Sequence, residues 1–328
     1  MHRFVALLAC WGVVAACAGT DPSAPGARGD GAEGSPVSAV AAVYPLSWLA
    51  EEVAPEADVT TLNAGGLQAH DVEITPGQRQ AVETADVVLF VGDIGYQPQV
   101  EQAVGSARGE VVSVAEVAGP ERLLEPVAEA HVEQEPAAEA HHGDGAAEAH
   151  SGEEAVVDPH IWFDAEVMAD VAVRTGEAFA TADPGNAETY RNNARAVSEE
   201  LAELGRELDA TLGGECRHLE VIVSHQAYGY LLAPLGVAQH GVTGINPQAG
   251  ASSAELAELV EEIEREGFGH VLTEPQEGRE GAETVAREAD VELLEISPLD
   301  AVTDEQAGAG FIELVRAQAA QFATALGC

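Results

Sequence analysis

Residues 189–212 read TYRNNARAVSEELAELGRELDATL, a polar and amphipathic run that decides the architecture we expect. Asp183 offers an N-cap, Pro184 fits the first helical turn, and Gly213 with Gly214 stops the pattern. A helix over residues 183–213 would be roughly 40 Å long. Such a helix, set between two halves of the chain, predicts a stiff connector rather than a hinge.

Short apolar runs alternate with helical periodicity on either side of this helix. The runs are typical of buried parallel strands and cover residues 37–43, 87–91, 111–114, 219–223, 270–273 and 291–296. Helical periodicity appears in residues 97–107, 253–266 and 279–289. The alternation predicts an α/β protein. Because roughly 290 residues exceed what one core usually serves, we expect two lobes of parallel-type sheets, residues 37–182 and 214–328.

The N-terminus has the pattern of an exported protein. Arg3 precedes an apolar stretch, residues 4–16, that is too short to span a bilayer and is typical of a secretory signal. The sequence VAAC ending at Cys17 resembles the lipobox of bacterial lipoproteins, in which the cysteine is acylated. LLAC ending at Cys10 is similar but leaves hardly any apolar core before it, and a plain secretory signal is the other alternative.

These patterns predict where the protein resides. We expect a lipoprotein signal peptide over residues 1–17 and a flexible tether over residues 18–36, which are small, polar and rich in glycine and proline. No other segment reaches membrane-spanning length. The expected location is the outer face of a bacterial cytoplasmic membrane, held there by lipid.

Composition narrows the classes of partner. The formal net charge is −43, with 57 acidic residues against 14 basic ones, all of them arginine. This balance argues against nucleic-acid binding. Diffuse negative charge attracts every cation alike, so specificity for one ion has to come from particular ligands.

The cysteines predict one disulfide. Two of the four cysteines lie in the signal region, which leaves Cys216 and Cys328. An oxidising compartment favours a disulfide between them, and two buried free thiols are the alternative.

Three histidines lie in separate islands that differ in sequence. They are His70 in GGLQAHDVEITP, His160 in VVDPHIWFD and His225 in VIVSHQAYGYL. Neutral imidazole is the commonest protein ligand of zinc, and three such ligands from distant parts of a chain can form one site. The sequence therefore predicts a metal site, while His218, His240 and His270 fit ordinary surface or core positions.

An acidic segment, residues 125–156, carries further histidines: His131, His141, His142 and His150. It has no apolar periodicity, so we expect it to be disordered. Its histidines predict a weak, flexible collector of zinc, and a solvated linker with chance histidines is the alternative.

HDVEITP, DPHIWFD and SHQAYGYL, with the later segments VLTEPQ and ISPLD, closely resemble the zinc- and manganese-binding lipoproteins of bacterial ABC importers. These form the cluster A-I solute-binding family, and its zinc-binding, ZnuA-like members are the nearer match. The resemblance implies two α/β lobes joined by one long helix, with the metal in the cleft between them. It also implies a membrane permease that accepts the metal, and we expect the binding protein to be a monomer.

The resemblance bears on the choice of metal. Manganese-binding members typically have a carboxylate where this chain has His225, and the harder ion suits the harder oxygen ligand. Three imidazoles favour Zn²⁺ as the transported ligand, and manganese or another divalent metal is the alternative. The acidic, histidine-bearing segment is a feature of zinc members.

The fourth ligand departs from the family's pattern. Members often supply an aspartate where this chain has Ser297, and a hydroxyl is a poor zinc ligand. Water comes first among the candidates for this position, ahead of Asp300 and Glu274. We expect Glu274 to act more as an acceptor that orients a histidine.

Two other functions share this ligand set. Three histidines and a water also form the site of zinc hydrolases, but the chain has no HExxH helix and no obvious general base besides Glu274, so we expect no enzyme. A surface zinc buffer or adhesin without a transport role is the other alternative.

Overall fold

The computed structural model describes residues 36–63, 69–70, 72–125, 157–244, 246, 250–275 and 279–328, and Pro36 to Cys328 form one compact unit. The predicted signal peptide, Cys10, Cys17 and the tether up to residue 35 lie outside the described residues. So do His131, His141, His142 and His150. These assignments stay predictions.

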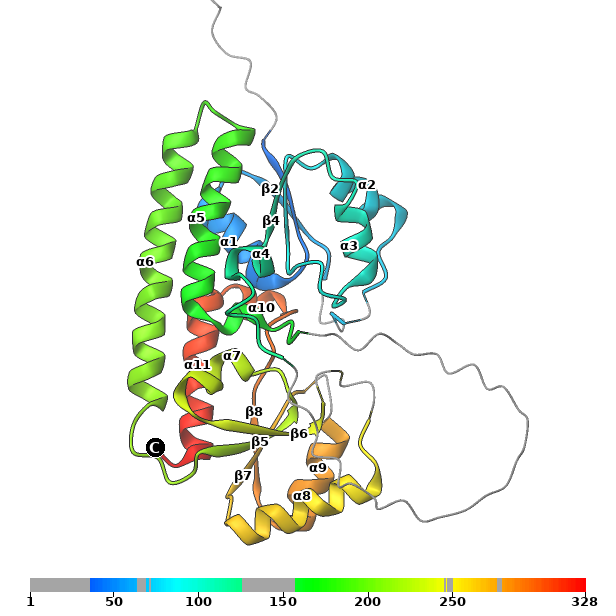
Figure 1. Cartoon of the computed structure of the whole chain (residues 1–328), viewed down its shortest axis with the longest axis vertical. Coiled ribbons are helices and arrows are strands. Elements are labelled where there is room, and N and C mark those ends of the chain that lie inside the picture. Colours follow the sequence, from blue (N-terminus) through cyan, green and yellow to red (C-terminus); the bar gives the residue numbers. More distant parts are fainter. Residues whose placement is uncertain are drawn as a thin grey trace, which may run out of the picture. The chain divides into compact units, whose positions relative to one another are not determined.

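The N-terminal half contains a four-stranded parallel sheet with the order β2-β1-β3-β4. Figure 1 labels its two outer strands, β2 and β4. Its strands are β1 (Ser38–Ala41), β2 (Asp58–Thr61), β3 (Val87–Phe90) and β4 (Glu110–Ser113). Its helices are α1 (Tyr44–Val53), α2 (Pro76–Thr84), α3 (Pro98–Val104), α4 (Val114–Ala118) and α5 (Ala165–Ala182). A 3₁₀ turn, Ile161–Phe163, precedes α5.

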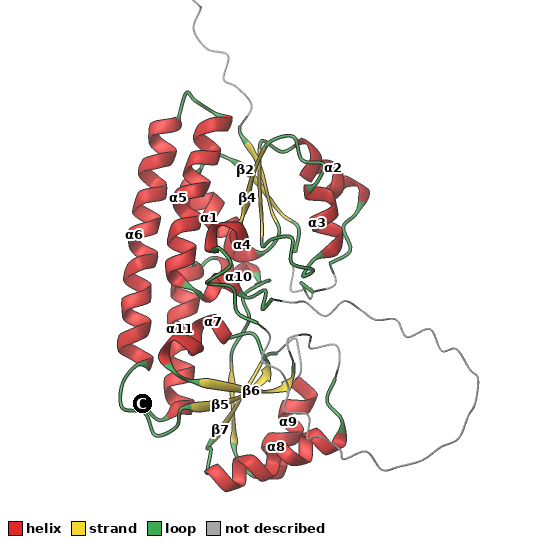
Figure 2. Cartoon of the chain, in the orientation of Figure 1, coloured by secondary structure: helices red, strands yellow, loops and turns green. Residues whose placement is uncertain are grey.

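The C-terminal half repeats the plan, with a parallel sheet in the order β6-β5-β7-β8. Figure 2 shows the strands of this sheet in yellow, with β5, β6 and β7 labelled. Its strands are β5 (Glu220–His225), β6 (Ala238–Thr243), β7 (His270–Thr273) and β8 (Glu292–Glu295). Its helices are α7 (Gly229–Leu232), α8 (Ser253–Glu266), α9 (Arg279–Ala289), α10 (Asp304–Ala307) and α11 (Phe311–Leu326), with a 3₁₀ turn at Ala233–Leu235. The predicted α/β class with two parallel-sheet lobes is confirmed.

Strands β2 and β6 were not predicted from the sequence. Both are edge strands, and their sequences, DVTT and AQHGVT, are largely polar. A continuous apolar run indicates a strand that is buried on both faces, such as β3, in which every residue is buried. An edge strand of polar residues gives no such signal.

The long helix α6 (Ala187–Leu212) begins later than the sequence predicted. Asn186, and not Asp183, is its N-cap residue, so the prediction that Pro184 occupies the first turn is wrong. Asp183 instead ends α5, and its carboxylate accepts hydrogen bonds from the Gly185 N–H and the Asn186 amide. These bonds shape a tight turn between two antiparallel helices. The helix ends before Gly213, as expected.

One large core runs through both halves. It joins residues of β1 and β3 to α1, α5 and α6, and continues into β5, α7 and α11. A smaller cluster lies under α2 and α3 on the other face of the first sheet, and another lies under α8 and α9 on the second. Figure 1 shows α5, α6 and α11 on the side of the molecule opposite α2, α3, α8 and α9. Both sheets are therefore covered on two faces.

A disulfide closes the C-terminal half. It joins Cys216, just after α6, to Cys328 at the end of α11, as the cysteine content predicted. Within the described ranges, no helix is both long and apolar enough to cross a membrane.

Candidate metal centre

Strand β5 carries His225 to the carboxyl end of the second sheet. Its apolar residues 221–223 are buried because the strand lies inside a sheet covered on both faces. Strand β7 pairs with β5, and Glu274 directly follows the last residue of β7. Since neighbouring parallel strands end at the same edge of a sheet, the two side chains meet there. Glu274 Oε2 lies 2.6 Å from His225 Nδ1.

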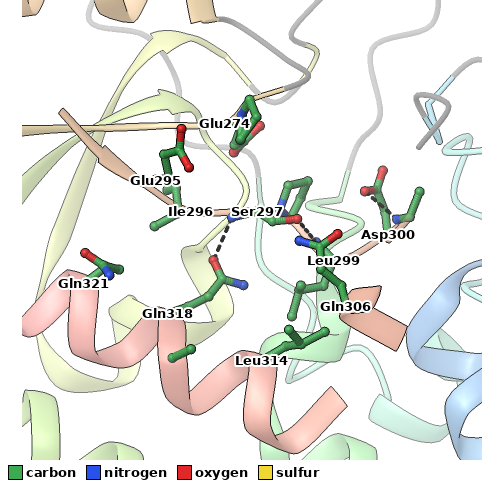
Figure 3. Close-up of a pocket in the computed structure, with 14 residues that line it drawn as sticks. Glu274, Glu295, Ile296, Ser297, Leu299, Asp300, Gln306, Leu314, Gln318 and Gln321 are labelled. Atoms are coloured by element: carbon green, nitrogen blue, oxygen red, sulfur yellow. Dashed lines mark hydrogen bonds between the residues drawn. The ribbon is translucent and has the colours of Figure 1, made fainter. Parts of the chain in front are cut away.

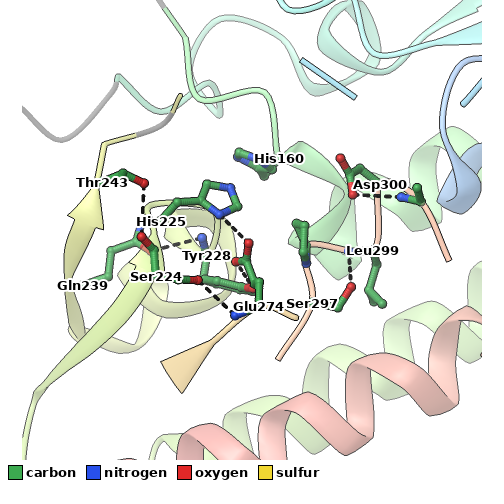
Figure 4. A network of polar contacts seen from close by, with 12 residues as sticks. His160, Ser224, His225, Tyr228, Gln239, Thr243, Glu274, Ser297, Leu299 and Asp300 are labelled. Carbon is green, nitrogen blue, oxygen red and sulfur yellow. Dashed lines mark hydrogen bonds and ion pairs between the residues drawn. The ribbon is translucent and has the colours of Figure 1, made fainter. Parts of the chain in front are cut away.

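Glu274 is held by two further groups (Figure 4). The Tyr228 hydroxyl donates a hydrogen bond to Glu274 Oε1 at 2.6 Å, and the Glu274 N–H donates to Ser224 Oγ at 3.1 Å. Both carboxylate oxygens therefore have a partner. A carboxylate on Nδ1 fixes the orientation of the His225 ring and makes Nε2 the nitrogen with the lone pair. This contact is the orienting role that the sequence suggested for Glu274.

His160 has the same kind of support from its own segment. Asp158 Oδ1 accepts a hydrogen bond from the His160 N–H at 2.9 Å and lies 2.8 Å from His160 Nδ1. Both side chains are buried. The segment continues into the 3₁₀ turn and α5, and there the Trp162 indole donates to the Pro298 carbonyl oxygen of the C-terminal half at 2.8 Å. These contacts therefore fix the orientation of the His160 ring and the position of its backbone.

His70 lies in the connection between β2 and α2 and is supported differently. Its ring meets the edge of the Tyr96 ring with the centroids 4.8 Å apart. Burial lowers the pKa of His70 well below its usual value, and the nearby imidazoles of His160 and His225 lower it further. His70 is therefore neutral at physiological pH, which is the form that can bind a metal.

The three rings converge. Their centroids lie 5.4 Å apart for His70 and His160, 5.4 Å for His160 and His225, and 6.2 Å for His70 and His225. One nitrogen from each ring lies within 4.8 Å of the others. Nε2 of His70 and of His160 is buried without a hydrogen-bond partner among the described residues. Buried polar atoms are normally satisfied, so this arrangement fits a shared cation better than a packing role.

The candidates for a fourth ligand lie in and beside the ISPLD turn. Ser297 Oγ accepts a hydrogen bond from the Leu299 N–H at 3.2 Å, so its hydroxyl already shapes the turn. Leu299 has a φ of 60°, the left-handed region, and this kink precedes Asp300. The Asp300 carboxylate is buried, and Figure 4 shows it to the right of His160, whereas Glu274 lies below that ring. Burial raises the pKa of Asp300, while the nearby His160 and His225 oppose that shift.

A cavity of about 220 Å³ lies beside this turn (Figure 3). It is bounded by α11, the end of β8 and residues 297–301, and Gln318 on its wall accepts a hydrogen bond from the Ser297 N–H at 2.8 Å. As far as the described residues show, Glu274 and Asp300 line it and the three histidines do not. The cavity is therefore adjacent to the histidine cluster and distinct from it.

A second group of potential ligands is less suited to an ion. His240 Nε2 lies 3.5 Å from Glu220 Oε2, and its Nδ1 lies 3.3 Å from Glu262 Oε1. One ligand atom from each of these three residues lies within 4.8 Å of the others, and all three residues are partly exposed. Exposed acidic groups often cluster without an ion, so this group makes a weaker case for a metal than the three converging imidazoles do.

Two residues that support the segment of His160 were not predicted from the sequence. Asp158 was quoted within its motif without a role, and Tyr230 was not considered. The signal for Asp158 is an aspartate two residues before a histidine, across a proline, which brings the carboxylate back onto the ring and backbone of His160. No comparable local signal exists for Tyr230, because its contacts are with residues far away in sequence.

Comparison with known proteins agrees with this geometry. The family model described as "Zinc-uptake complex component A periplasmic" (ZnuA) matches residues 39–325. The zinc-binding protein AdcA of Streptococcus pyogenes serotype M3 is 26% identical over 280 residues, which cover 85% of this chain and 53% of that protein. The chain thus spans about half the length of this relative.

Two solved structures share the fold. A crystal structure of ZnuA superimposes with a TM-score of 0.70 at 21% identity, covering 89% of this chain and 99% of that one. The Zn(II)-bound ZnuA-like domain of Streptococcus pneumoniae AdcA gives a TM-score of 0.68 at 21% identity, covering 89% and 100%. With a family model that spans nearly all of its described residues, the chain belongs to the ZnuA family of periplasmic zinc-uptake components.

Proposed function

We propose that this chain binds one Zn²⁺ ion through His70, His160 and His225 and delivers it to the permease of an ABC-type importer. The observation that carries the proposal is the convergence of three imidazole nitrogens within 4.8 Å of one another. Membership of a family described as a zinc-uptake component supports transport over catalysis.

Nitrogen ligands support zinc over manganese. Imidazole suits zinc, whereas manganese favours carboxylate and other oxygen ligands. Two of the three rings have a carboxylate on Nδ1, which raises the basicity of the metal-binding nitrogen. The name of the Streptococcus pyogenes relative, a zinc-binding protein, points in the same direction. Manganese remains the alternative that a titration has to exclude.

For the fourth position we propose Asp300, with water as the alternative. Glu274 is disfavoured because both of its oxygens already accept from His225 and Tyr228. Ser297 is disfavoured because its hydroxyl accepts from the Leu299 N–H. The Asp300 carboxylate is buried beside two of the histidines, and its negative charge would offset part of the charge of a bound Zn²⁺.

Calorimetric competition of zinc and manganese tests the proposal. The protein should bind one equivalent of zinc tightly, and alanine at His70, His160 or His225 should lower the affinity by orders of magnitude, because only three strong ligands hold the ion. His218→Ala is the matched control, since His218 packs on Phe268 outside the cluster. Unchanged zinc affinity in His225→Ala would refute this site and reopen the manganese alternative.

We also propose that the mature chain is a monomer anchored by an acyl group on Cys17. Support comes from the VAAC pattern in the sequence. Labelling of cells with a radioactive fatty acid should mark the wild-type protein and not Cys17→Ser. Label retained in that variant would favour Cys10, and label absent from both proteins would favour a plain secretory signal.

The histidines of residues 125–156 are proposed as weak zinc collectors. Deleting residues 125–154 should then leave the tight site nearly unchanged and remove weaker zinc equivalents from the titration. Loss of the tight site on deletion would mean that this segment supplies one of its ligands.

A further inference from the structure

Tyr230 of α7 joins the two chain segments that flank residues 126–156. Its hydroxyl accepts a hydrogen bond from the Leu124 N–H at 2.9 Å and donates one to the Asp158 carbonyl oxygen at 3.1 Å. The Asp158 N–H donates to the Leu124 carbonyl oxygen at 2.9 Å, which completes a ring of three hydrogen bonds. Tyr230 belongs to the C-terminal half and the other two residues to the N-terminal half. The ring therefore ties the halves together at the segment that carries His160.

Gly229, the first residue of α7, packs against the other side of Asp158. A Cβ atom at Gly229 would lie 2.7 Å from Asp158 Oδ2, closer than real Cβ contacts allow. The carboxylate has little freedom to move away, because it is buried and its Oδ1 contacts both the backbone N–H and Nδ1 of His160. A side chain at Gly229 would therefore push directly on the pair formed by Asp158 and His160.

We propose that Gly229 and Tyr230 are positioning residues for the metal site. Tyr230 fixes the backbone of Asp158, the absence of a side chain at Gly229 leaves room for its carboxylate, and the carboxylate directs the His160 ring. The direction of one ligand in the N-terminal half thus depends on contact with the C-terminal half. This inference rests on the proposed zinc binding, and it adds that the ion is held tightly only while the two halves stay in contact at α7.

Two variants test the two contacts separately. Tyr230→Phe removes the hydroxyl with little change of shape, and Gly229→Ala adds one methyl group against Asp158. Each should weaken zinc binding about 10- to 100-fold, the usual effect of losing a partner that orients a metal ligand, with the stoichiometry still one. Release of zinc to an excess of chelator, followed by stopped flow, should accelerate in both variants.

A spectroscopic measurement on the zinc-free protein separates positioning from a general loss of stability. In NMR spectra of histidine-labelled protein, the imidazole nitrogen signals of His160 should shift in both variants. Those of His225 should stay, since His225 is oriented by Glu274 and not by Asp158. A change that only loosened the fold would not select His160.

Matched controls exist elsewhere in the chain. Tyr190→Phe also removes a hydroxyl, one that donates to Asp183 at the turn between α5 and α6. Gly176→Ala adds a Cβ that would lie 2.5 Å from the Ala194 Cβ between the same two helices. Both should lower the melting temperature while leaving the zinc affinity within about twofold of wild type, as expected for changes at distant sites.

The outcomes separate this inference from the proposed function. If the wild type binds zinc, His160→Ala abolishes binding, and both α7 variants bind as the wild type does, then the positioning role is wrong and the function stands. If the wild type binds no zinc, the proposed function fails, and the NMR spectra of the zinc-free protein still test the contact with His160. Should Gly229→Ala not fold, the nearly isosteric Tyr230→Phe decides alone.

Discussion

The three histidines of the cluster differ in what holds them. His160 and His225 each have a carboxylate on Nδ1, whereas His70 is supported by the Tyr96 ring and by burial. A carboxylate partner makes a ring a better donor to a metal, and burial keeps a ring neutral. In this cluster, carboxylates orient the rings of His160 and His225. His70 has no such partner in the described part of the chain, and burial keeps its ring in the neutral form that binds a metal.

Asp300 and Ser297 give a residue-level test of the fourth ligand. Asp300→Asn removes a buried negative charge beside His160 and His225 and should lower zinc affinity at pH 7.5 by about tenfold or more, at least the loss expected for an outer partner. Ser297→Ala removes only a hydroxyl that accepts from the backbone, and its zinc affinity should stay within about twofold of wild type. Zinc competition titrations measure both.

Other results would change the assignment. A small loss in Asp300→Asn would leave water in the fourth position. A large loss in Ser297→Ala would mean that the turn rearranges on binding so that the hydroxyl, at the position where the family often has an aspartate, reaches the ion.

Residues were predictable where their role follows from chemical type and a local motif. His70, His160 and His225 stand out because each lies in a distinct sequence island, and the structure brings them together. Tyr230 could not be found in this way. Its partners, Leu124 and Asp158, are 106 and 72 positions away, and a tyrosine in an apolar run indicates only that it is buried.

At the level of elements, sequence patterns predict buried strands correctly. They fail where tertiary contacts determine where an element begins or ends. Strand β7 and helices α8 and α9 have the predicted bounds, because burial and capping leave a local signal. The start of α6 was wrong, since Asp183 is as good an N-cap as Asn186 until α5 is known to end there. The backbone N–H of Asp183 closes α5, and its carboxylate forms the turn that leads to Asn186.

Asp183 provides the element-level prediction. Hydrogen bonds lower its pKa, first of all that from Asn186, then those from Tyr190 and from the backbone at Gly185. Because the folded pKa lies below the unfolded value of about 3.9, the stabilisation is complete above that pH and is lost as the pH falls through the folded pKa. Asp183→Ala should lower the melting temperature at pH 7 by about 1–3 °C, as for loss of an exposed capping group.

Thermal unfolding monitored by circular dichroism checks this result. The difference between wild type and Asp183→Ala should shrink as the pH falls below about 4. Asp209→Ala, at an exposed aspartate of α6, is the control for loss of one negative charge from a very acidic protein. A deficit of equal size at pH 7 and pH 3 would show that the carboxylate does not stabilise the turn through its charged form.

At the level of the whole molecule, the disulfide and the metal cluster lie at opposite ends of β5. Cys216 precedes the strand and His225 is its last residue, and six strand residues span roughly 20 Å. Reducing the bond between Cys216 and Cys328, 112 positions apart, should destabilise the protein by up to about 4–5 kcal/mol on the chain-entropy model. Urea unfolding of the double serine variant measures this loss.

Zinc affinity of the folded double serine variant should match that of the wild type, because the cluster is remote from the bond. A strong fall in affinity at a urea concentration where the variant remains folded would contradict the separation of the two ends of the sheet. Mass spectrometry of the unreduced protein gives an independent check, since two free thiols would rule out the bond.

Zinc should stabilise the N-terminal and C-terminal halves of the protein together, and not only one of them. The large core is continuous from the first sheet through α5 and α6 to the second. Contacts also join the two halves beside the cluster, such as the hydrogen bond that the Tyr44 N–H donates to the Asp300 carbonyl oxygen at 3.0 Å.

An ion that binds only the folded chain, and is present at about 1,000 times its Kd, adds about 4 kcal/mol to the free energy of unfolding. For about 290 residues that corresponds to a rise in melting temperature of roughly 6–8 °C. Calorimetry should give a single transition that shifts as a unit with zinc, shifts much less with manganese, and does not shift in His160→Ala. Two transitions, of which zinc moved only one, would mean that all the ligands belong to one half, and the three-histidine site across both halves would have to be abandoned.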